Sequence, residues 1–300
     1  MVPSVTKQGF PAEFIQHEPG VRCFNSALFA LNGLQLLATR RCDPRTLLHD
    51  IVINRLEGNI TRQVCVVRLP RKDGRENFED PRLFMHRGKL HLSYVEGRYW
   101  YPGHALQQLA VLGDDFSVEQ VITIPFGDNG VGYEKNWQFF VLSERLYFVY
   151  SVAPHIVVEL TEDYKVKRRF FTQGRVPFMD LLRGGTPPQH IPGFFQCFVH
   201  FHTDHFSRNR RYGMCAYRFY DSPPFEPASL SEVLLRGSEE DPTLPNVAHP
   251  TWNPLVIFPC GIIKREDHWL VSAGINDSTD VLLKLPFDIK HTSIVGPVAK

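Results

Sequence analysis

Two adjacent carboxylic acids, Glu79 and Asp80, stand directly before Pro81-Arg82 and an apolar segment. A residue that precedes proline is biased towards extended backbone, and proline itself donates no backbone hydrogen bond. We therefore expect both acids to be held rigidly, in extended geometry, where the chain begins a hairpin whose turn is Arg87-Gly88. A carboxyl group fixed in this way is suited to donate a proton during a reaction, and Asp80 is the candidate.

The composition is that of an ordinary soluble globular protein. The chain has 300 residues, of which 43% are apolar and 22% are charged, and its net charge is +1. This balance creates no general field for nucleic acid or for an anionic membrane, so we expect neither as a partner. The amino-terminal residues are not apolar, and no apolar run approaches the roughly 18 residues of a membrane span, so we expect no secretory leader and no spanning helix.

The cysteines and histidines predict a cytoplasmic protein without a metal. The six cysteines have no Cys-x-x-Cys spacing and lie mostly in apolar segments, which is typical of reduced, buried thiols. Among the thirteen histidines, His200, His202 and His205 form the densest group, and the first two share one face if their segment is a strand. No cluster of acids or cysteines completes a metal site around them, so we expect no metal and no cofactor.

A strand–turn–strand pattern recurs five times along the chain. The turns fall near residues 33, 88, 144, 193 and 267, so the repeat is about 50 to 75 residues long. Second strand pairs follow the first three turns, at 50–56 with 64–69, 107–111 with 118–124 and 156–160 with 165–171. Two hairpins in each repeat give four strands, which is the size of a propeller blade. Helical periodicity is weak, and 229–235 is the best short candidate.

These repeats predict an all-β, five-bladed β-propeller in which residues 1–300 form a single domain around a central pocket. A closed ring leaves few exposed strand edges. No stretch rich in serine and glycine divides the chain, and a β-sandwich, the alternative architecture, would need fewer strands or two domains. The segment 236–253, rich in proline and acids, is expected to be a long loop over one face.

A short polar motif precedes each of the five hairpins. The motifs are Phe24-Asn25-Ser26, Glu79-Asp80-Pro81-Arg82, Glu134-Lys135-Asn136-Trp137, Arg183-Gly184-Gly185-Thr186-Pro187-Pro188 and His249-Pro250-Thr251-Trp252-Asn253. In a propeller the innermost strands face a central channel, so residues at one phase of every repeat converge there. Such charges and aromatic rings suit a sugar, whose hydroxyls need fixed donors and acceptors. Taken singly, each motif also fits a structural turn, such as a positive φ at the paired glycines.

Four of the sequence's motifs resemble a known family of carbohydrate-active enzymes. In order, they are Glu79-Asp80-Pro81-Arg82-Leu83, Glu134-Lys135-Asn136-Trp137, Arg183-Gly184-Gly185-Thr186-Pro187 and Ser272-Ala273-Gly274-Ile275-Asn276-Asp277. They resemble glycoside hydrolase family 130 and the related β-1,2-mannosyltransferases and phosphorylases of glycosyltransferase family 108, as a distant branch. The resemblance covers the chain from about Asn25 to Asp277. It implies a five-bladed propeller and inverting phosphorolysis, transfer or hydrolysis of β-mannosides, with mannose 1-phosphate as product or donor.

The resemblance also implies a role for each matched residue. Asp80 takes the place of the general acid, which protonates the leaving oxygen through a sugar hydroxyl while inorganic phosphate attacks the anomeric carbon from the other face. Phosphate is then a co-substrate that only needs cations to hold it. The candidate phosphate ligands are Arg40, Arg98, Lys135 and His200, and the candidate contacts to the mannoside or oligosaccharide are Asn25, Glu79, Tyr94, Asn136, Arg183 and Asp277.

Three other readings of the sequence stay open. A β-mannoside hydrolase of the same fold would ignore phosphate and would need a second carboxylate, for which Glu79, Glu96 and Glu134 are candidates. A non-catalytic carbohydrate-binding propeller would keep the aromatic residues without the cluster of ions, and a protein-interaction propeller would lack a convergent set of acids and cations. The enzyme hypothesis requires Asp80, Lys135 and His200, together with Arg98, to surround one pocket. The acceptor sugar, the linkage and assembly into a homo-oligomer are left open.

Overall fold

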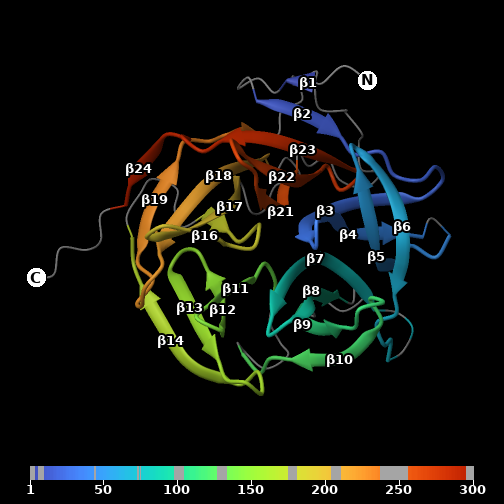
Figure 1. The fold of residues 1–300 in the computed structure, drawn as a ribbon, viewed down its shortest axis with the longest axis horizontal. Coiled ribbons are helices and arrows are strands. Elements are labelled where there is room, and N and C mark those ends of the chain that lie inside the picture. The colour runs from blue at the N-terminus through green and yellow to red at the C-terminus, as the bar shows by residue number, and fades with distance from the viewer. Residues whose placement is uncertain are drawn as a thin grey trace, which may run out of the picture.

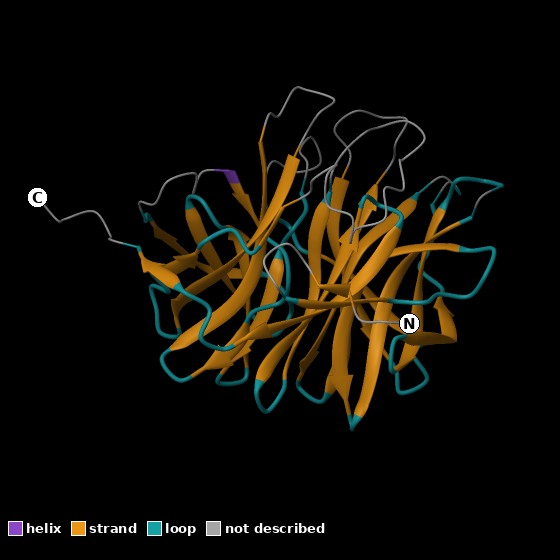
Figure 2. Ribbon diagram, turned by 90° about the horizontal axis from the view of Figure 1, so that it is seen from above, coloured by secondary structure: helices purple, strands orange, loops and turns teal. Residues whose placement is uncertain are grey.

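The computed structural model describes residues 4–5, 10–43, 45–72, 74, 76–97, 105–126, 134–174, 181–203, 211–236 and 256–294. The described part of the chain is built from β-strands and contains no α-helix, so the predicted all-β class is confirmed. Leu181 lies in a 3-10 turn. Figure 2 accordingly shows strands and loops with a single short helical piece. The best short helical candidate, 229–235, is not a helix, because β19 (Pro227–Ser231) pairs there as a strand. Among the described residues, no helix has the length and apolar character needed to cross a membrane.

Three of the sheets contain four antiparallel strands each, in sequence order. The first sheet is β3 (Arg22–Leu31), β4 (Leu34–Cys42), β5 (His49–Glu57) and β6 (Ile60–Val67). The second is β7 (Asn77–His86), β8 (Lys89–Gly97), β9 (Ala105–Leu112) and β10 (Val118–Thr123). The third is β11 (Gln138–Leu142), β12 (Arg145–Ser151), β13 (His155–Leu160) and β14 (Val166–Thr172). The tight turns that join β3 to β4 and β7 to β8 use Gly33 and Gly88 at φ values of 79° and 70°, a backbone that glycine adopts without strain.

Two further sheets combine segments from distant parts of the chain. The fourth sheet contains β15 (Leu182–Arg183), β16 (Gln189–Ile191), β17 (Phe194–Thr203), β18 (Arg211–Tyr220), β19, β20 (Leu235–Arg236) and β24 (His291–Ser293). The fifth contains β21 (Ile257–Lys264), β22 (His268–Ile275), β23 (Thr279–Pro286), β2 (Pro11–Phe14) and β1 (Ser4–Val5). The amino-terminal β2 therefore extends a sheet made by the carboxy-terminal part of the chain, and β24 extends the sheet before it.

The five sheets surround a common centre in a propeller-like arrangement (Figure 1). Strands β3, β7, β11 and β21 each lie at one end of their sheet. They also meet one another, since β3 contacts both β7 and β21, and β7 contacts β11 and β21. The polar motifs of the first two repeats lie within the innermost strands β3 and β7, and that of the third directly precedes β11, which brings these three motifs towards the middle of the molecule.

Apolar side chains fill the space between every pair of neighbouring sheets. The first and second sheets share a cluster that includes Leu36 and Leu92, and the second and third share one that includes Leu109 and Phe148. Similar clusters join the third sheet to the fourth and the fourth to the fifth. A smaller cluster with Leu28 and Leu270 joins the fifth sheet back to the first. The ring of sheets is thus held together by burial of apolar surface between adjacent sheets on every side.

The remaining predictions about the chain have mixed outcomes. All six cysteines are free thiols, and five of them are buried. The predicted long loop at 236–253 lies outside the described residues apart from Arg236, which belongs to β20.

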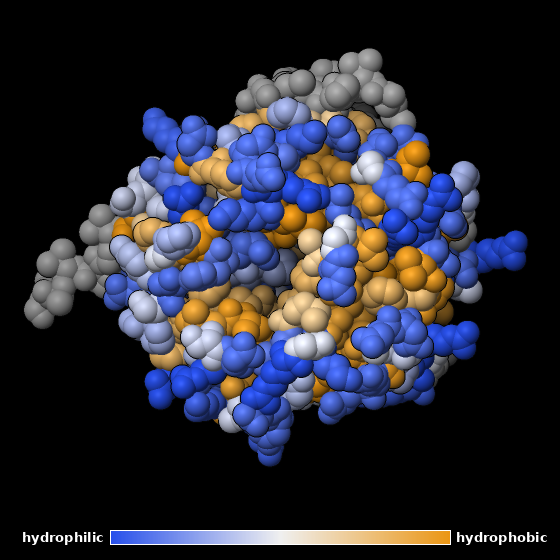
Figure 3. Space-filling model, viewed as in Figure 1, coloured by the Kyte–Doolittle hydropathy of each residue, from blue (hydrophilic) through white to orange (hydrophobic). Residues whose placement is uncertain are grey.

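Figure 3 shows the face seen in Figure 1, on which hydrophilic residues crowd the rim and hydrophobic residues reach the surface nearer the centre.

Candidate active site

Asp80 lies on a β-bulge in β7 rather than on regular strand. The pairing of β7 with β8 shifts between Glu79 and Arg82, and Asp80 has a φ of 49°. The extended backbone predicted for the residue before Pro81 was therefore wrong, because the bulge places Asp80 in the left-handed region. Aspartate and asparagine tolerate this region better than most residues. The bulge rotates the Asp80 side chain out of the strand's alternating pattern.

Arg82 holds this bulge in place. Its guanidinium Nη1 donates to the carbonyl oxygens of Asp80 and Pro81, each at 2.9 Å. Its Nε donates across the centre of the ring to the carbonyl oxygen of Gly185 at 2.8 Å, and the guanidinium lies 4.9 Å from the ring centroid of Phe258. Arg82 is 3% exposed. Arg82 therefore acts as a buried clamp between the second and fourth sheets, and these three hydrogen bonds all go to backbone carbonyl oxygens.

The same backbone device recurs in two neighbouring repeats. Asn25 has a φ of 54° at a bulge in β3, where the pairing shifts between Phe24 and Ala27. Asn136 has a φ of 66° just before β11 begins. Asn25, Asp80 and Asn136 occupy the same phase of three successive repeats and share a positive φ, on a bulge in β3 and β7 and just before the strand at β11. In the sequence, this positive-φ position is indicated by an asparagine or aspartate at the same phase of each of these repeats.

Asn25 links two carboxylates. Its amide Nδ2 donates to Asp80 Oδ1 and to Asp277 Oδ1, both at 3.2 Å. Arg22 Nη2 donates to the backbone carbonyl of Asp277 at 2.7 Å, which fixes the turn that carries this residue. A Cβ atom on Gly274 would lie 1.8 Å from Asn25 Oδ1, so glycine is required there to leave room for the amide. Two of the predicted substrate contacts, Asn25 and Asp277, thus lie beside the predicted acid.

Arg40 is the cation nearest to the acid pair among the described contacts. Its Nη2 lies 3.0 Å from Glu79 Oε1, and its Nη1 lies 3.8 Å from Asp80 Oδ1. The guanidinium stacks on Phe24 at 4.7 Å from the ring centroid. Arg40 also donates to His49 Nδ1 from Nε at 2.9 Å and from Nη2 at 2.7 Å. The sequence reasoning missed His49, because no motif or repeat phase distinguishes this histidine from the other twelve.

The surroundings of Asp80 suit a proton donor. Burial is the main cause that raises the pKa of its carboxyl, the Arg40 charge opposes this, and the nearby Glu79 carboxylate raises the pKa further. Arg82 and Lys135 also act to lower this pKa, but the net direction is upward. The Asp80 side chain is 13% exposed, which leaves an edge of it accessible. A carboxyl that keeps its proton above the ordinary range can protonate a leaving group near neutral pH.

Lys135 and His200 share this electrostatic neighbourhood. The Lys135 charge acts on the pKa of Asp80 and also on that of His200. Burial is the main cause that lowers the pKa of His200, and Lys135 and Arg183 lower it further, so its imidazole is neutral. The ring lies 4.9 Å from Phe258, and its Nδ1 has no hydrogen-bond partner in the described part of the chain. Lys135, which precedes β11, is thus close enough for its charge to act on Asp80 of β7 and on His200 of β17.

Asn136 and Arg183 line a cavity next to these groups. The cavity has a volume of about 230 Å³ and is also lined by Lys135, Tyr150 and Gly184. The buried Asn136 Oδ1 has no hydrogen-bond partner within the described ranges. Two cations and an amide therefore face one hollow between the third and fourth sheets, which is an arrangement suited to an anionic or hydroxyl-bearing ligand.

The paired glycines of the Arg183 motif serve close packing. Neither has a positive φ, so the conformational explanation was wrong. A Cβ atom on Gly184 would lie 2.0 Å from the carbonyl oxygen of Asn136, and one on Gly185 would lie 2.2 Å from that of Phe198. The glycines therefore let three backbone segments approach one another under the candidate site.

Two of the predicted site residues cannot be placed at the site. Tyr94 is 1% exposed and packs edge-on against Phe78, with ring centroids 5.6 Å apart, in the apolar cluster between the first and second sheets. Its assignment as a substrate contact is not supported, because a ring enclosed in that core cannot reach a ligand. Arg98 lies outside the described residues. The other two carboxylates considered for a hydrolase have protein partners, since Gln108 donates to Glu96 and Tyr150 donates to Glu134, each at 3.3 Å.

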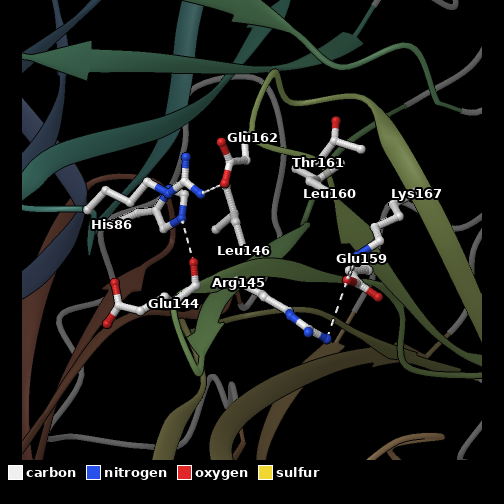
Figure 4. A pocket seen from close by; sticks show the side chains of 10 residues that line it. His86, Glu144, Arg145, Leu146, Glu159, Leu160, Thr161, Glu162 and Lys167 are labelled. Carbon is white, nitrogen blue, oxygen red and sulfur yellow. Dashed lines mark hydrogen bonds and ion pairs between the residues drawn. The ribbon is translucent and has the colours of Figure 1, made fainter.

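A second cavity, of about 240 Å³, lies at the turns of the second and third sheets (Figure 4). Its ionic side chains pair with one another: Arg87 contacts Glu162, and Lys167 Nζ lies 2.8 Å from the buried Glu159. His86, at the opposite end of β7 from Asp80, also lines it. This cavity is therefore separate from the candidate site, and its three cations Arg87, Arg145 and Lys167 are paired with Glu162 and Glu159.

Sequence comparison alone does not place the chain in a family. No family model matches it, and no curated protein matches its sequence. Its fold does match solved structures. A β-1,2-mannobiose phosphorylase from Listeria innocua is 13% identical, with 92% of this chain and 90% of that chain covered at a TM-score of 0.66. The GDP-Man-dependent mannosyltransferase MPT-1 from Leishmania mexicana is 14% identical, with 96% and 94% covered at a TM-score of 0.67.

A third match comes from work on glycoside hydrolases in the GH130 family of mannoside phosphorylases that target β-1,2-mannosidic linkages in Candida mannan. It is 12% identical, with 95% of this chain and 88% of that chain covered at a TM-score of 0.64. The protein therefore has the all-β, propeller-like fold of these carbohydrate-active enzymes. The predicted resemblance to glycoside hydrolase family 130 and its mannosyltransferase relatives, as a distant branch, is confirmed at the level of the fold.

Proposed function

We propose that this protein is a carbohydrate-active enzyme that transfers or phosphorolyses β-mannosides, with Asp80 as its general acid. The observation that carries the proposal is the raised pKa of the Asp80 carboxyl together with its position, linked by Asn25 to Asp277 and facing the cations Arg40 and Lys135. The five sheets, each packed on its two neighbours, are in this proposal the five blades of a single-domain propeller. The six free thiols support a cytoplasmic location.

The proposed reaction is an inverting displacement. An oxygen of inorganic phosphate forms a bond to the anomeric carbon of the mannosyl unit while the bond to the leaving oxygen breaks. The Asp80 proton passes to that leaving oxygen through a hydroxyl of the sugar, and Asp80 is left as a carboxylate. In the reverse direction mannose 1-phosphate donates its mannosyl unit to an acceptor hydroxyl, and Asp80 recovers the proton.

The cations divide between two tasks in this mechanism. Arg40 is already engaged by Glu79 and His49, so we assign it to orienting the acid pair and the sugar rather than to phosphate alone. Lys135 and Arg183 line the neighbouring cavity with Asn136, and this hollow is where we propose that phosphate binds. The neutral imidazole of His200, on which the Lys135 and Arg183 charges act, would donate a hydrogen bond to the ligand without adding charge.

A hydrolase is the second candidate, and Asp277 is the observation that favours it. Hydrolysis with inversion needs a carboxylate to activate water. Asn25 Nδ2 is 3.2 Å from both Asp80 and Asp277, so a second carboxylate stands beside the acid. Asp277 is the residue to test for this role, because Asn25 holds its carboxylate beside that of Asp80.

Phosphate dependence separates the two candidates. The purified protein is incubated with mannose 1-phosphate and a panel of acceptor sugars, and released phosphate is measured; β-1,2-mannobiose is incubated in parallel with and without phosphate. A phosphorylase releases phosphate in the first assay and consumes mannobiose only when phosphate is present. A hydrolase consumes mannobiose without phosphate. Inertness in every arm would remove the β-mannoside proposal.

A further inference from the structure

His49 and Arg40 form a buried contact that the proposed reaction does not by itself require. Both Nε and Nη2 of Arg40 point their protons at the single lone pair of His49 Nδ1, at 2.9 Å and 2.7 Å. The backbone N–H of His49 donates to Asn77 Oδ1 at 2.8 Å, which fixes the main chain there, and the imidazole meets the Phe24 ring edge-on with centroids 5.9 Å apart. Arg40 is 7% exposed and His49 is 9% exposed.

This contact exists only when His49 is neutral. An imidazole can accept at Nδ1 only if that nitrogen carries no proton, so the proton must be on Nε2. Burial is the main cause that lowers the pKa of His49, and the Arg40 and Arg22 charges lower it too, whereas Glu79 raises it. The ring is therefore neutral at physiological pH. The arginine that stands 3.0 Å from Glu79 Oε1 depends on this state of its neighbour.

We infer that His49 is a positioning residue for the reaction proposed above: its neutral imidazole fixes the Arg40 guanidinium against Glu79 and beside Asp80. The inference rests on the proposed function for its catalytic consequence, while the contact itself can be tested without any activity. His49 touches neither the acid's proton nor the substrate in this scheme. It acts through the arginine, and through the arginine on the charge balance of Asp80.

Protonation of His49 would exchange partners within this cluster. Glu79 Oε1 lies 3.7 Å from His49 Nδ1, so a protonated ring could donate to Glu79 and take the place of Arg40. The guanidinium would then face a cation instead of an acceptor and would move away. The other charged groups around the ring are Arg22, on β3, and Arg71, whose Nη2 donates to the His49 carbonyl at 2.9 Å and to Asp50 at 2.6 Å. Both are cations, so they add to the positive charge around a protonated ring.

Two substitutions at His49 test separately the hydrogen-bond acceptor, Nδ1, and the aromatic ring. In His49→Asn the amide oxygen can occupy the place of Nδ1 and accept from Arg40, but it cannot take up a proton. In His49→Phe the ring remains and the acceptor is lost. We expect His49→Phe to lower kcat by about ten- to a hundredfold at neutral pH, the size expected when one hydrogen bond to a charged group is lost, and His49→Asn to restore most of it. In the wild-type protein, protonation of His49 at low pH should lower kcat. This fall in kcat at low pH should be absent from the pH–rate profile of His49→Asn.

A measurement on the ring itself keeps the inference independent of turnover. Nitrogen-15 NMR of the full-length protein should show His49 as the Nε2–H tautomer, and Arg40→Met should raise its pKa because a neighbouring positive charge is removed. A His49 pKa that does not rise in Arg40→Met would overturn the inference, and so would equal activities of the Asn and Phe variants of a protein whose wild type is active. If the ring responds as expected but the wild-type protein has no activity on β-mannosides, the contact stands and the proposed function fails.

Discussion

Gly274→Ala tests the geometry on which the candidate site depends. The new Cβ atom would lie 1.8 Å from Asn25 Oδ1 and 2.9 Å from its Cγ, so the amide oxygen has to move by more than about 1.5 Å to reach ordinary contact distance. That movement breaks the bonds from Nδ2 to Asp80 and Asp277. Loss of these bonds and overpacking should together lower the free energy of unfolding by about 3 kcal/mol. A displacement of this size should also lower kcat by about a hundredfold.

The assay is a double-mutant cycle in urea, read by tryptophan fluorescence. Asn25→Gly removes the obstructing side chain and keeps a residue that accepts the φ of 54°. In that background Gly274→Ala should lower the unfolding free energy by less than about 1 kcal/mol. Gly113→Ala is the matched control, because its Cβ would meet only the ends of flexible side chains at 3.2 Å. If the effects of Gly274→Ala and Asn25→Gly simply add, the clash with Asn25 is not the cause and the reasoning is refuted.

Three other predictions concern Arg82, which holds the bulge in β7, Asp280, which links the fifth sheet to Ser26 in the first, and Asp80, the proposed acid. Arg82→Met leaves the carbonyl oxygens of Asp80 and Gly185 without their donor, and it should lower the unfolding free energy in urea by about 2–4 kcal/mol. Asp280→Ala removes the buried acceptor of the Ser26 amide and hydroxyl, and it should lower the same quantity by about 3–5 kcal/mol; a loss under 1 kcal/mol would contradict this. Since Asp80 must be protonated to act, kcat/KM should fall as pH rises through its raised pKa, and Arg40→Gln, which removes an opposing charge, should move that fall to higher pH; an unmoved alkaline limb would contradict the assignment.

The recurring strand–turn–strand unit explains why so much of the architecture could be predicted from the sequence. Each turn expected near 33, 88, 144, 193 and 267 joins two paired strands, because short apolar segments separated by glycine or polar pairs leave few other ways to bury their faces. The polar motifs of the first three repeats could be placed at the inner strands for the same reason, whereas the motif at 249–253 lies outside the described residues. Their position depends only on their phase in the repeat.

Contacts between distant residues explain what was missed. The sequence around Asp80 favoured extended backbone, but the bulge is held by Arg82, which reaches Gly185 in another sheet. Tyr94 was assigned to the substrate from its place in a motif, yet its side chain points into the core between two sheets. His49 became visible only when the fold placed it against Arg40. Such tertiary pairings have no signature in a single sequence.

The role of Asp80 is the central claim, and Asp80→Asn tests it most directly. The variant is compared with the wild-type protein and with Asp267→Asn, the same change at an exposed turn, for phosphate release from mannose 1-phosphate in the presence of acceptor sugars. The account predicts that Asp80→Asn loses turnover by about a thousandfold or more while its sugar affinity and thermal stability stay near those of the wild type. Full activity in Asp80→Asn would contradict it.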